Sequence, residues 1–203
     1  MSAPVEFDAI VLVGGAGARL GGIDKAAVQL AGRSLVSRPL EAVRDAQTLV
    51  VVGHTSAEVP ERAVRVVEEP AGSGPAAASV AGLRAIQRPA EWTYLIACDL
   101  PGAVSAIQLL GAADAGDADG VVLAEPDGRL QWLLGRYRSS ALRAAADALG
   151  DPANRSMRAL LGDLRLAELP ADDVWRDVDT WADHEQWARA LDDSRATPPP
   201  KGQ

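Results

Sequence analysis

Five glycines fall within the nine residues from Gly14 to Gly22, and two cations, Arg19 and Lys25, accompany them. Glycine has no Cβ, so a loop of this composition can wrap closely around a ligand and turn its backbone N–H groups inward. Amide groups with two fixed positive charges suit a triphosphate, because Arg grips phosphate oxygens bidentately and Lys supplies a point charge. The residue types at this spacing predict a nucleoside triphosphate site.

Two common phosphate loops are excluded by the residues of this segment. The dinucleotide fingerprint G-x-G-x-x-G would begin at Gly15, but Leu20 occupies its third glycine position and no acidic residue ends the strand expected at 48–52. A P-loop needs Gly-Lys-Ser/Thr, whereas Lys25 lies between an aspartate and an alanine. What remains is a glycine-rich segment with an arginine and a lysine, followed by L-x-G-x-x-L at 30–35.

A carboxylate follows a predicted central strand. Asp99 comes directly after the apolar run 94–98, so it is expected at the carboxyl end of a strand, where α/β sheets bind ligands. A single carboxylate, together with triphosphate oxygens and water, suits Mg²⁺, which is rarely held in a full protein cage. Asp99 is the candidate metal ligand, and its alternative role is to cap the turn into the next helix, next to Pro101.

These residues must be positioned by a repeating order of strands and helices. That order predicts one α/β domain, a Rossmann-like three-layer α/β/α sandwich with a mostly parallel sheet. The turn signal at 126–128 predicts an antiparallel hairpin near one edge of the sheet. The expected strands are 9–13, 48–52, 63–67, 93–97, 120–124 and 130–137, and the expected helices are 35–46, 76–86, 104–115, 141–149 and 181–191.

Composition narrows the class of protein. The 203 residues are enough for one well-buried domain, expected at 1–191, and the Pro-rich segment 192–203 is expected to be a disordered tail. A net charge of −8 argues against non-specific binding to nucleic acid or to an anionic membrane. Residues 1–7 lack the features of a signal peptide, and no apolar run reaches the roughly 20 residues that span a bilayer, so we expect a cytoplasmic protein. The single cysteine, Cys98, excludes an internal disulfide and is expected in the core.

The glycine-rich segment resembles the signature of sugar-nucleotide-type nucleotidyltransferases, and within that superfamily it is most similar to the molybdenum-cofactor guanylyltransferase family. The resemblance extends from about residue 9 to residue 187. It continues in five downstream motifs, which are Gly74–Leu83, Cys98-Asp99-Leu100-Pro101, Gln131–Tyr137, Asn154–Arg158 and Asp177–Thr180.

The resemblance implies a fold of the nucleotide-diphospho-sugar transferase type and a reaction. GMP would be transferred from GTP to the terminal phosphate of molybdopterin or molybdenum cofactor, with Mg²⁺ as the cofactor and pyrophosphate as the leaving group. Molybdoenzymes or their chaperones are the implied receiving partners. The resemblance implies that the catalytic residues are Arg19, Lys25 and Asp99. It implies that the metal ligand is Asp99, with Asp179 as a second candidate, and that the acceptor is bound by Arg155, Arg158, Asp177 and Asp179. The implied nucleotide-binding residues are Leu12, Val13, Gly14, Gly15, Gly17, Lys25, Glu69, Gly74 and Asp99.

Several alternatives stay open at the level of sequence. The Gly-Gly pair after residue 13 resembles guanine-transferring members, but segments 67–70 and 74–82 depart from the family pattern, which leaves CTP or another phosphorylated acceptor open. Asp177 and Asp179 would share one side of an extended strand, although Asp179 or Thr180 could instead cap the last helix. Glu69 and the two arginines at 155 and 158 have ordinary surface roles as their alternatives. A catalytically inactive nucleotide-binding protein is disfavoured, because it need not retain all three catalytic candidates.

Overall fold

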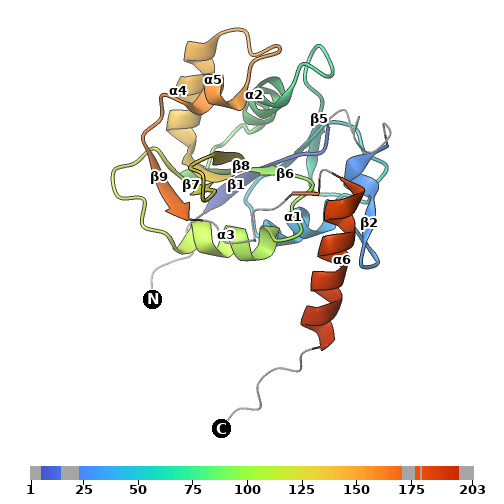
Figure 1. Ribbon diagram of the computed structural model, residues 1–203. Coiled ribbons are helices and arrows are strands. Elements are labelled where there is room, and N and C mark those ends of the chain that lie inside the picture. Colours follow the sequence, from blue (N-terminus) through green and yellow to red (C-terminus); the bar gives the residue numbers. More distant parts are fainter. Residues whose placement is uncertain (1–5, 15–22, 171–176, 179, 197–203) are drawn as a thin grey trace.

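In the computed structural model of the chain, helices lie on both faces of a central sheet (Figure 1). The structure describes residues 6–14, 23–170, 177–178 and 180–196. Within these residues the main sheet has the strand order β5-β4-β1-β6-β8-β7-β9, and a small second sheet pairs β2 with β3. The strands are β1 (Phe7–Leu12), β2 (Gln29–Leu30), β3 (Arg33–Ser34), β4 (Leu49–Val52), β5 (Val64–Val66), β6 (Trp92–Ala97), β7 (Gly120–Ala124), β8 (Leu130–Arg138) and β9 (Leu166–Pro170).

The strand directions confirm the mostly parallel sheet that the sequence predicts. β4, β1 and β6 are parallel neighbours, as are β4 and β5, and β7 pairs with β9 in parallel. Among the described strands of the main sheet, only β8 runs antiparallel to its neighbours, which are β6 and β7. The hairpin expected around 126–128 therefore exists, as β7 and β8.

The hairpin lies near one edge of the sheet, as predicted, but it does not form the edge itself. β9 pairs with the outer side of β7, so the hairpin lies one position in from the edge. The segment Leu166–Pro170 is short and ends in proline, and its side chains are half-buried or exposed. It lacks the continuous apolar run that marks the central strands, and proline is tolerated on an edge strand because it cannot donate to a ladder.

The helices form one layer on each face of the sheet (Figure 1). α1 (Ser37–Ala42) and α3 (Ala103–Ala112) cover one face, and α2 (Pro75–Ala85), α4 (Ser139–Leu149) and α5 (Met157–Leu161) cover the other. Successive residues of β1 alternate between the two core clusters, with Ala9 and Val11 in one and Ile10 and Leu12 in the other. Burial on both faces explains why the central strands are mostly apolar.

Arginine side chains bind the last carbonyl groups of several helices. Arg143 donates to the carbonyl oxygens of Leu83 and Ile86, at 3.1 and 2.7 Å, where α2 ends. Arg136 does the same for α3, and Arg62 for the end of α1. The last carbonyls of a helix lack the full set of N–H partners found in its inner turns, and a cation near them also interacts favourably with the helix dipole.

The C-terminal helix α6 (Trp181–Ala196) extends away from the sheet beside β2 (Figure 1). Thr180 begins it in a reciprocal cap: its Oγ1 accepts from the Asp183 N–H at 3.2 Å, and its own N–H donates to Asp183 Oδ2 at 2.8 Å. The helix is longer than the predicted 181–191, because residues 192–196 continue it, and the boundary between domain and tail at 191 and 192 stays a prediction. The first proline after the start of α6 is Pro198, and proline does not continue a helix. The rest of the predicted tail, residues 197–203, lies outside the described residues.

The first long helix is shorter than predicted. The expected helix 35–46 contains α1, which ends at Ala42, because the backbone of Val43 leaves the helical region at φ −114° and ψ 23°. Residues 35 and 36 are buried but belong to the turn before the helix. The spacing of the apolar residues therefore predicted the buried positions correctly but gave a helix that is too long.

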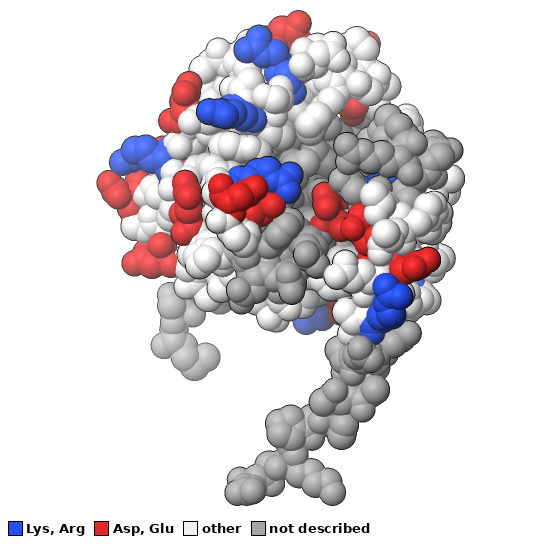
Figure 2. All heavy atoms as spheres, in the orientation of Figure 1, with Lys and Arg blue, Asp and Glu red and all other residues white. Residues whose placement is uncertain are grey.

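Charged side chains of both signs are interspersed on the face of the molecule shown in Figure 2. This distribution agrees with the acidic composition of the chain. In the described part of the chain, no helix combines the length and apolar character needed to cross a membrane.

Candidate active site

The structure brings together two of the predicted catalytic residues, Lys25 and Asp99. Leu12 at the end of β1 pairs in register with Ala97 at the end of β6, so the segments that follow both strands start at the same edge of the sheet. Lys25 opens the 3-10 turn η2 (Lys25–Ala27), and its Nζ forms an ion pair with Asp99 Oδ2. The two side chains are only 16% and 13% exposed. A cation and a carboxylate are thus held together in a sheltered position at the carboxyl edge.

This pair offers both groups that a nucleotide–metal complex needs. The ammonium group is a point charge for phosphate oxygens, and the Asp99 carboxylate is a hard oxygen ligand already facing a cation. Among the described residues there is no group of three or more His, Cys, Asp or Glu side chains that could hold a metal. A divalent ion at Asp99 would therefore take its remaining ligands from substrate oxygens and water, as Mg²⁺ commonly does.

Asp24, which the sequence analysis did not select, fastens the Lys25 turn to the segment after β4. Its Oδ2 accepts hydrogen bonds from Ser56 N–H at 2.6 Å, Ser56 Oγ at 2.9 Å and Thr55 Oγ1 at 2.9 Å. Partial burial raises the pKa of the Asp24 carboxyl, but the hydrogen bonds from Ser56 and Thr55 outweigh it and hold the pKa below its ordinary value. The signal in the sequence was an aspartate next to the lysine and two hydroxyl residues after a predicted strand.

The start of the glycine-rich loop lies against the end of β4. Gly53 has φ +108°, and a Cβ there would lie 2.6 Å from the backbone nitrogen of Gly14. Only glycine allows this approach of two backbones. Gly15, Gly17 and Arg19 lie outside the described residues.

Leu12 and Val13, two predicted nucleotide-binding residues, have side chains that are buried in the core. The Leu12 carbonyl accepts from Cys98 N–H at 3.1 Å, and the Val13 N–H donates to the Val52 carbonyl at 2.9 Å. Both backbone groups are therefore used by the sheet. A nucleotide contact at Leu12 or Val13 stays a prediction, and it would involve backbone atoms other than the Leu12 carbonyl oxygen and the Val13 nitrogen.

Cys98 lies between the apolar strand and Asp99 and is buried. Burial, followed by the negative charge of Asp99, raises the pKa of its thiol far above the ordinary value. A thiol that remains protonated is a poor nucleophile, so Cys98 is the small core residue that the sequence predicts.

The segment 177–178 crosses next to Asp99. The Val178 N–H donates to the Asp99 carbonyl at 3.1 Å, and the Val178 side chain is buried with Leu30 and Leu35. This contact places the exposed Asp177 beside the site. The expectation of an extended strand here was wrong for 177–178, which belong to no strand, and Asp179 lies outside the described residues. Thr180, the other predicted cap, does cap α6.

The predicted nucleotide-binding residues Glu69 and Gly74 lie on the connection between β5 and α2. Glu69 is exposed, while its neighbour Glu68 accepts a hydrogen bond from the Gly72 N–H at 2.9 Å and so stabilises this connection. Gly74 precedes α2 with φ +92°. The ion pair involves only Lys25 and Asp99, so the contact of Glu69 and Gly74 with a nucleotide stays a prediction.

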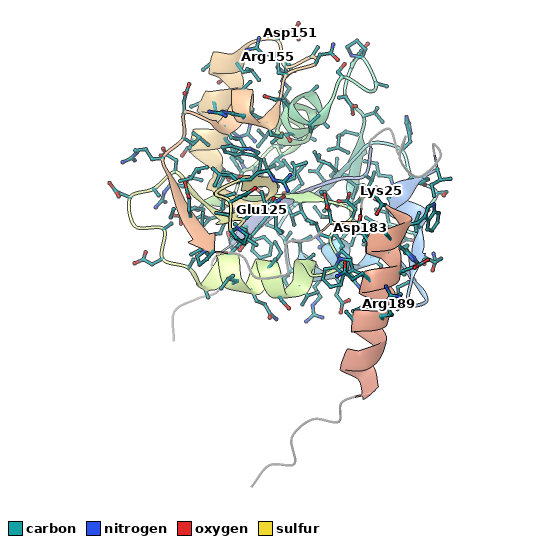
Figure 3. The ribbon with its side chains drawn as sticks, in the orientation of Figure 1. Lys25, Glu125, Asp151, Arg155, Asp183 and Arg189 are labelled. Atoms are coloured by element: carbon teal, nitrogen blue, oxygen red, sulfur yellow. The ribbon has the colours of Figure 1, made fainter. Side chains whose placement is uncertain are left out.

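The predicted acceptor-binding residues Arg155 and Arg158 lie at α5 and are exposed. Figure 3 shows Arg155 at the end of the molecule formed by α4 and α5, away from Lys25 beside α6. Arg155 lines a cavity of about 540 Å³ together with Asp119 and Asp163. The structure does not bring the two arginines to Lys25 and Asp99, and their role toward an acceptor stays a prediction.

Comparison with known proteins assigns this chain, with its mostly parallel α/β sheet, to the nucleotidyltransferases. Residues 9–169 match the family described as the MobA-like NTP transferase domain. The chain belongs to this family.

Named relatives are found at moderate identity. The chain is 32% identical over 183 residues to a probable molybdenum cofactor guanylyltransferase of Opitutus terrae, covering 84% of this chain and 88% of that one. It is 33% identical over 100 residues to the molybdenum cofactor guanylyltransferase of Serratia proteamaculans, covering 47% of this chain and 50% of that protein. The solved structure of molybdopterin-guanine dinucleotide biosynthesis protein A from Archaeoglobus fulgidus has a TM-score of 0.62 at 20% identity and covers 92% of this chain and 100% of that one. At this identity the structural likeness shows the shared fold alone.

Proposed function

We propose that this nucleotidyltransferase transfers GMP from GTP to the terminal phosphate of molybdopterin or molybdenum cofactor and releases pyrophosphate. The observation that carries the proposal is the Lys25–Asp99 pair at the carboxyl edge of the sheet. The relatives named as molybdenum cofactor guanylyltransferases support the choice of nucleotide and acceptor, and so does the Gly-Gly pair at the start of the loop.

In this reaction an oxygen of the acceptor phosphate attacks the α-phosphorus of the nucleotide. The nucleophile is already an anion, so the main tasks are to bring two anions together and to stabilise charge on the transferring phosphoryl group. Lys25 would bind triphosphate oxygens, and Arg19 is proposed as the second cation. Asp99 would hold Mg²⁺, which when bound neutralises phosphate charge. Asp177, beside Asp99, is proposed to orient the acceptor together with Asp179, Arg155 and Arg158.

We propose a cytoplasmic enzyme that passes the dinucleotide cofactor to molybdoenzymes or their chaperones. The acidic composition, with a net charge of −8, supports a small-molecule substrate over nucleic acid.

The test is pyrophosphate release by the purified chain with Mg²⁺, molybdenum cofactor and either GTP or CTP. We expect release with GTP and loss of release in Asp99→Ala. Faster release with CTP would overturn the choice of base. No release with any nucleotide and acceptor would overturn the proposed reaction, provided that the protein is folded by circular dichroism.

A further inference from the structure

We propose that Asp24 is a positioning residue that holds Lys25 against Asp99 by fastening the Lys25 turn to the segment after β4. Lys25 lies in a 3-10 turn of three residues. Two hydrogen bonds within this turn run from Ala27 N–H to the Asp24 carbonyl at 3.1 Å and from Val28 N–H to the Lys25 carbonyl at 3.2 Å. So short a turn gains little stability from its own hydrogen bonds, so its position depends on what it is attached to.

The Asp24 carboxylate supplies that attachment. It accepts hydrogen bonds from both the side chain and the backbone of Ser56, 32 residues away in the sequence, and from the hydroxyl of Thr55, 31 residues away. An ionised carboxylate can accept several hydrogen bonds at once, and bonds to an ionised acceptor are short and strong. The distances of 2.6 to 2.9 Å at Oδ2 match such bonds.

The segment that Asp24 grips is itself fixed to the sheet. Gly53 continues β4 and donates its N–H to the Val66 carbonyl at 2.9 Å, and the Ala57 N–H bonds to Thr55 Oγ1 at 3.0 Å. β4 is the direct neighbour of β1, which in turn pairs with β6, the strand that carries Asp99. Asp24 therefore links the backbone of Lys25 to the same sheet that positions its partner.

This link has a consequence for catalysis, which rests on the proposed function. The lysine ammonium lies at the end of a flexible four-carbon stem, so a fixed backbone restricts where the charge can lie. A displacement of about 1 Å in a group that positions phosphate can lower a rate by about a hundredfold. Asp24 acts through Lys25 and does not itself contact the reacting atoms.

A double-mutant cycle with Lys25 tests this role. We expect Asp24→Ala to lower kcat/KM for GTP between about tenfold and a hundredfold, and Asp24→Asn to recover part of that loss because one amide oxygen can still accept from Ser56. In a Lys25→Ala background the further Asp24→Ala change should have little effect. A double variant whose loss is the product of the two single losses would overturn the proposal.

A second readout does not depend on turnover or on the identity of the substrates. Lys25 and Lys201 are the lysines of this chain, so reductive methylation followed by peptide mass spectrometry reports on Lys25 by itself. We expect Asp24→Ala to raise the labelling rate of Lys25 at least severalfold, as Asp99→Ala should. An unchanged rate would overturn the proposal, whereas absence of pyrophosphate release by the unaltered chain would count only against the proposed function.

Asp119→Ala is the matched control. Asp119 is also a hydrogen-bonded carboxylate, since its Oδ2 accepts from the Arg165 N–H at 2.9 Å, but it precedes β7 at the amino edge of the sheet. Both alanine variants should lose thermal stability, and only the Asp24 variant should raise the labelling rate of Lys25. Equal effects of the two variants on Lys25 labelling would contradict the proposed role.

Discussion

Neutralising Asp99 should separate what the Lys25–Asp99 pair does for stability from what it does for the reaction. In Asp99→Asn the Lys25 ammonium stays in a position where it is only 16% exposed and loses the negative charge of Asp99. Exposed ion pairs contribute about 0–1 kcal/mol, whereas removing one partner of a buried pair costs about 3–5 kcal/mol. With the two side chains at 16% and 13% exposure, we expect a loss near the buried end, about 2–4 kcal/mol of unfolding free energy. At about 2–4 °C per kcal/mol for a chain of this length, Tm should fall by roughly 4–16 °C.

The double variant Lys25→Met/Asp99→Asn removes both charges and leaves groups of similar volume. Replacing a buried ion pair by neutral residues is often close to neutral in stability, so we expect the double variant to be more stable than Asp99→Asn alone. Its activity should remain lost, because neither charge is present to bind phosphate or metal. Urea titration followed by circular dichroism gives the unfolding free energies, and pyrophosphate release gives the activity.

The refuting result concerns the coupling between the two positions. A real pair should give a coupling energy of about 1–3 kcal/mol between Lys25→Met and Asp99→Asn in unfolding. If the two losses simply add, the two charges do not interact in solution and the site described above is wrong. Arg33→Met/Glu41→Gln is the comparison cycle, because that pair, at 2.7 Å, is more than 40% exposed on both sides and should couple by less than about 1 kcal/mol.

Three further outcomes follow from the geometry. Gly53→Ala should destabilise the fold by about 1–3 kcal/mol and weaken GTP binding in calorimetry, because its Cβ would meet the Gly14 nitrogen at 2.6 Å; unchanged binding would contradict this. Arg143→Ala should cost about 1–3 kcal/mol in urea titration and leave kcat unchanged, because the side chain binds two carbonyls at the end of α2; a loss of kcat at full folding would argue against a purely structural role. The pKa of Asp24 is lowered in the folded chain, so its contribution to stability is present above the ordinary value of 3.8 and is lost as the pH falls through the folded pKa. Asp24→Asn should therefore flatten the dependence of unfolding free energy on pH below about 4. The same pH dependence in the variant and the unaltered chain would contradict the lowered pKa of Asp24.

The main sheet could be predicted because its central strands carry their signal locally. The apolar run that became β1 is buried on both faces, and continuous apolar character is the local mark of such a strand. β9 and the small β2–β3 sheet carry no such mark, since they are short and only partly buried. Their pairing depends on neighbours that the chain supplies from distant positions, and this information is absent from a local window.

The same division applies to the candidate site. Lys25 and Asp99 were selected because each lies in a motif with its own chemical character, and the structure joins them in an ion pair. Asp24 was passed over because its partners, Thr55 and Ser56, lie more than thirty residues away and carry no motif. The contact of Val178 with the Asp99 loop was likewise invisible, although the resemblance to a family had singled out its flanking aspartates.

The sequence by itself determined the class of fold, the two ends of the ion pair and the need for a glycine-rich loop, because side-chain type, periodicity and backbone freedom are local properties. Only the tertiary structure decided that the β7–β8 hairpin lies inside the sheet, that Asp24 binds the segment after β4, and that Val178 reaches Asp99. Each of these depends on hydrogen bonds between segments far apart in the chain. Such bonds depend on how the strands are placed next to one another, so the residue types alone do not determine which partners they bind.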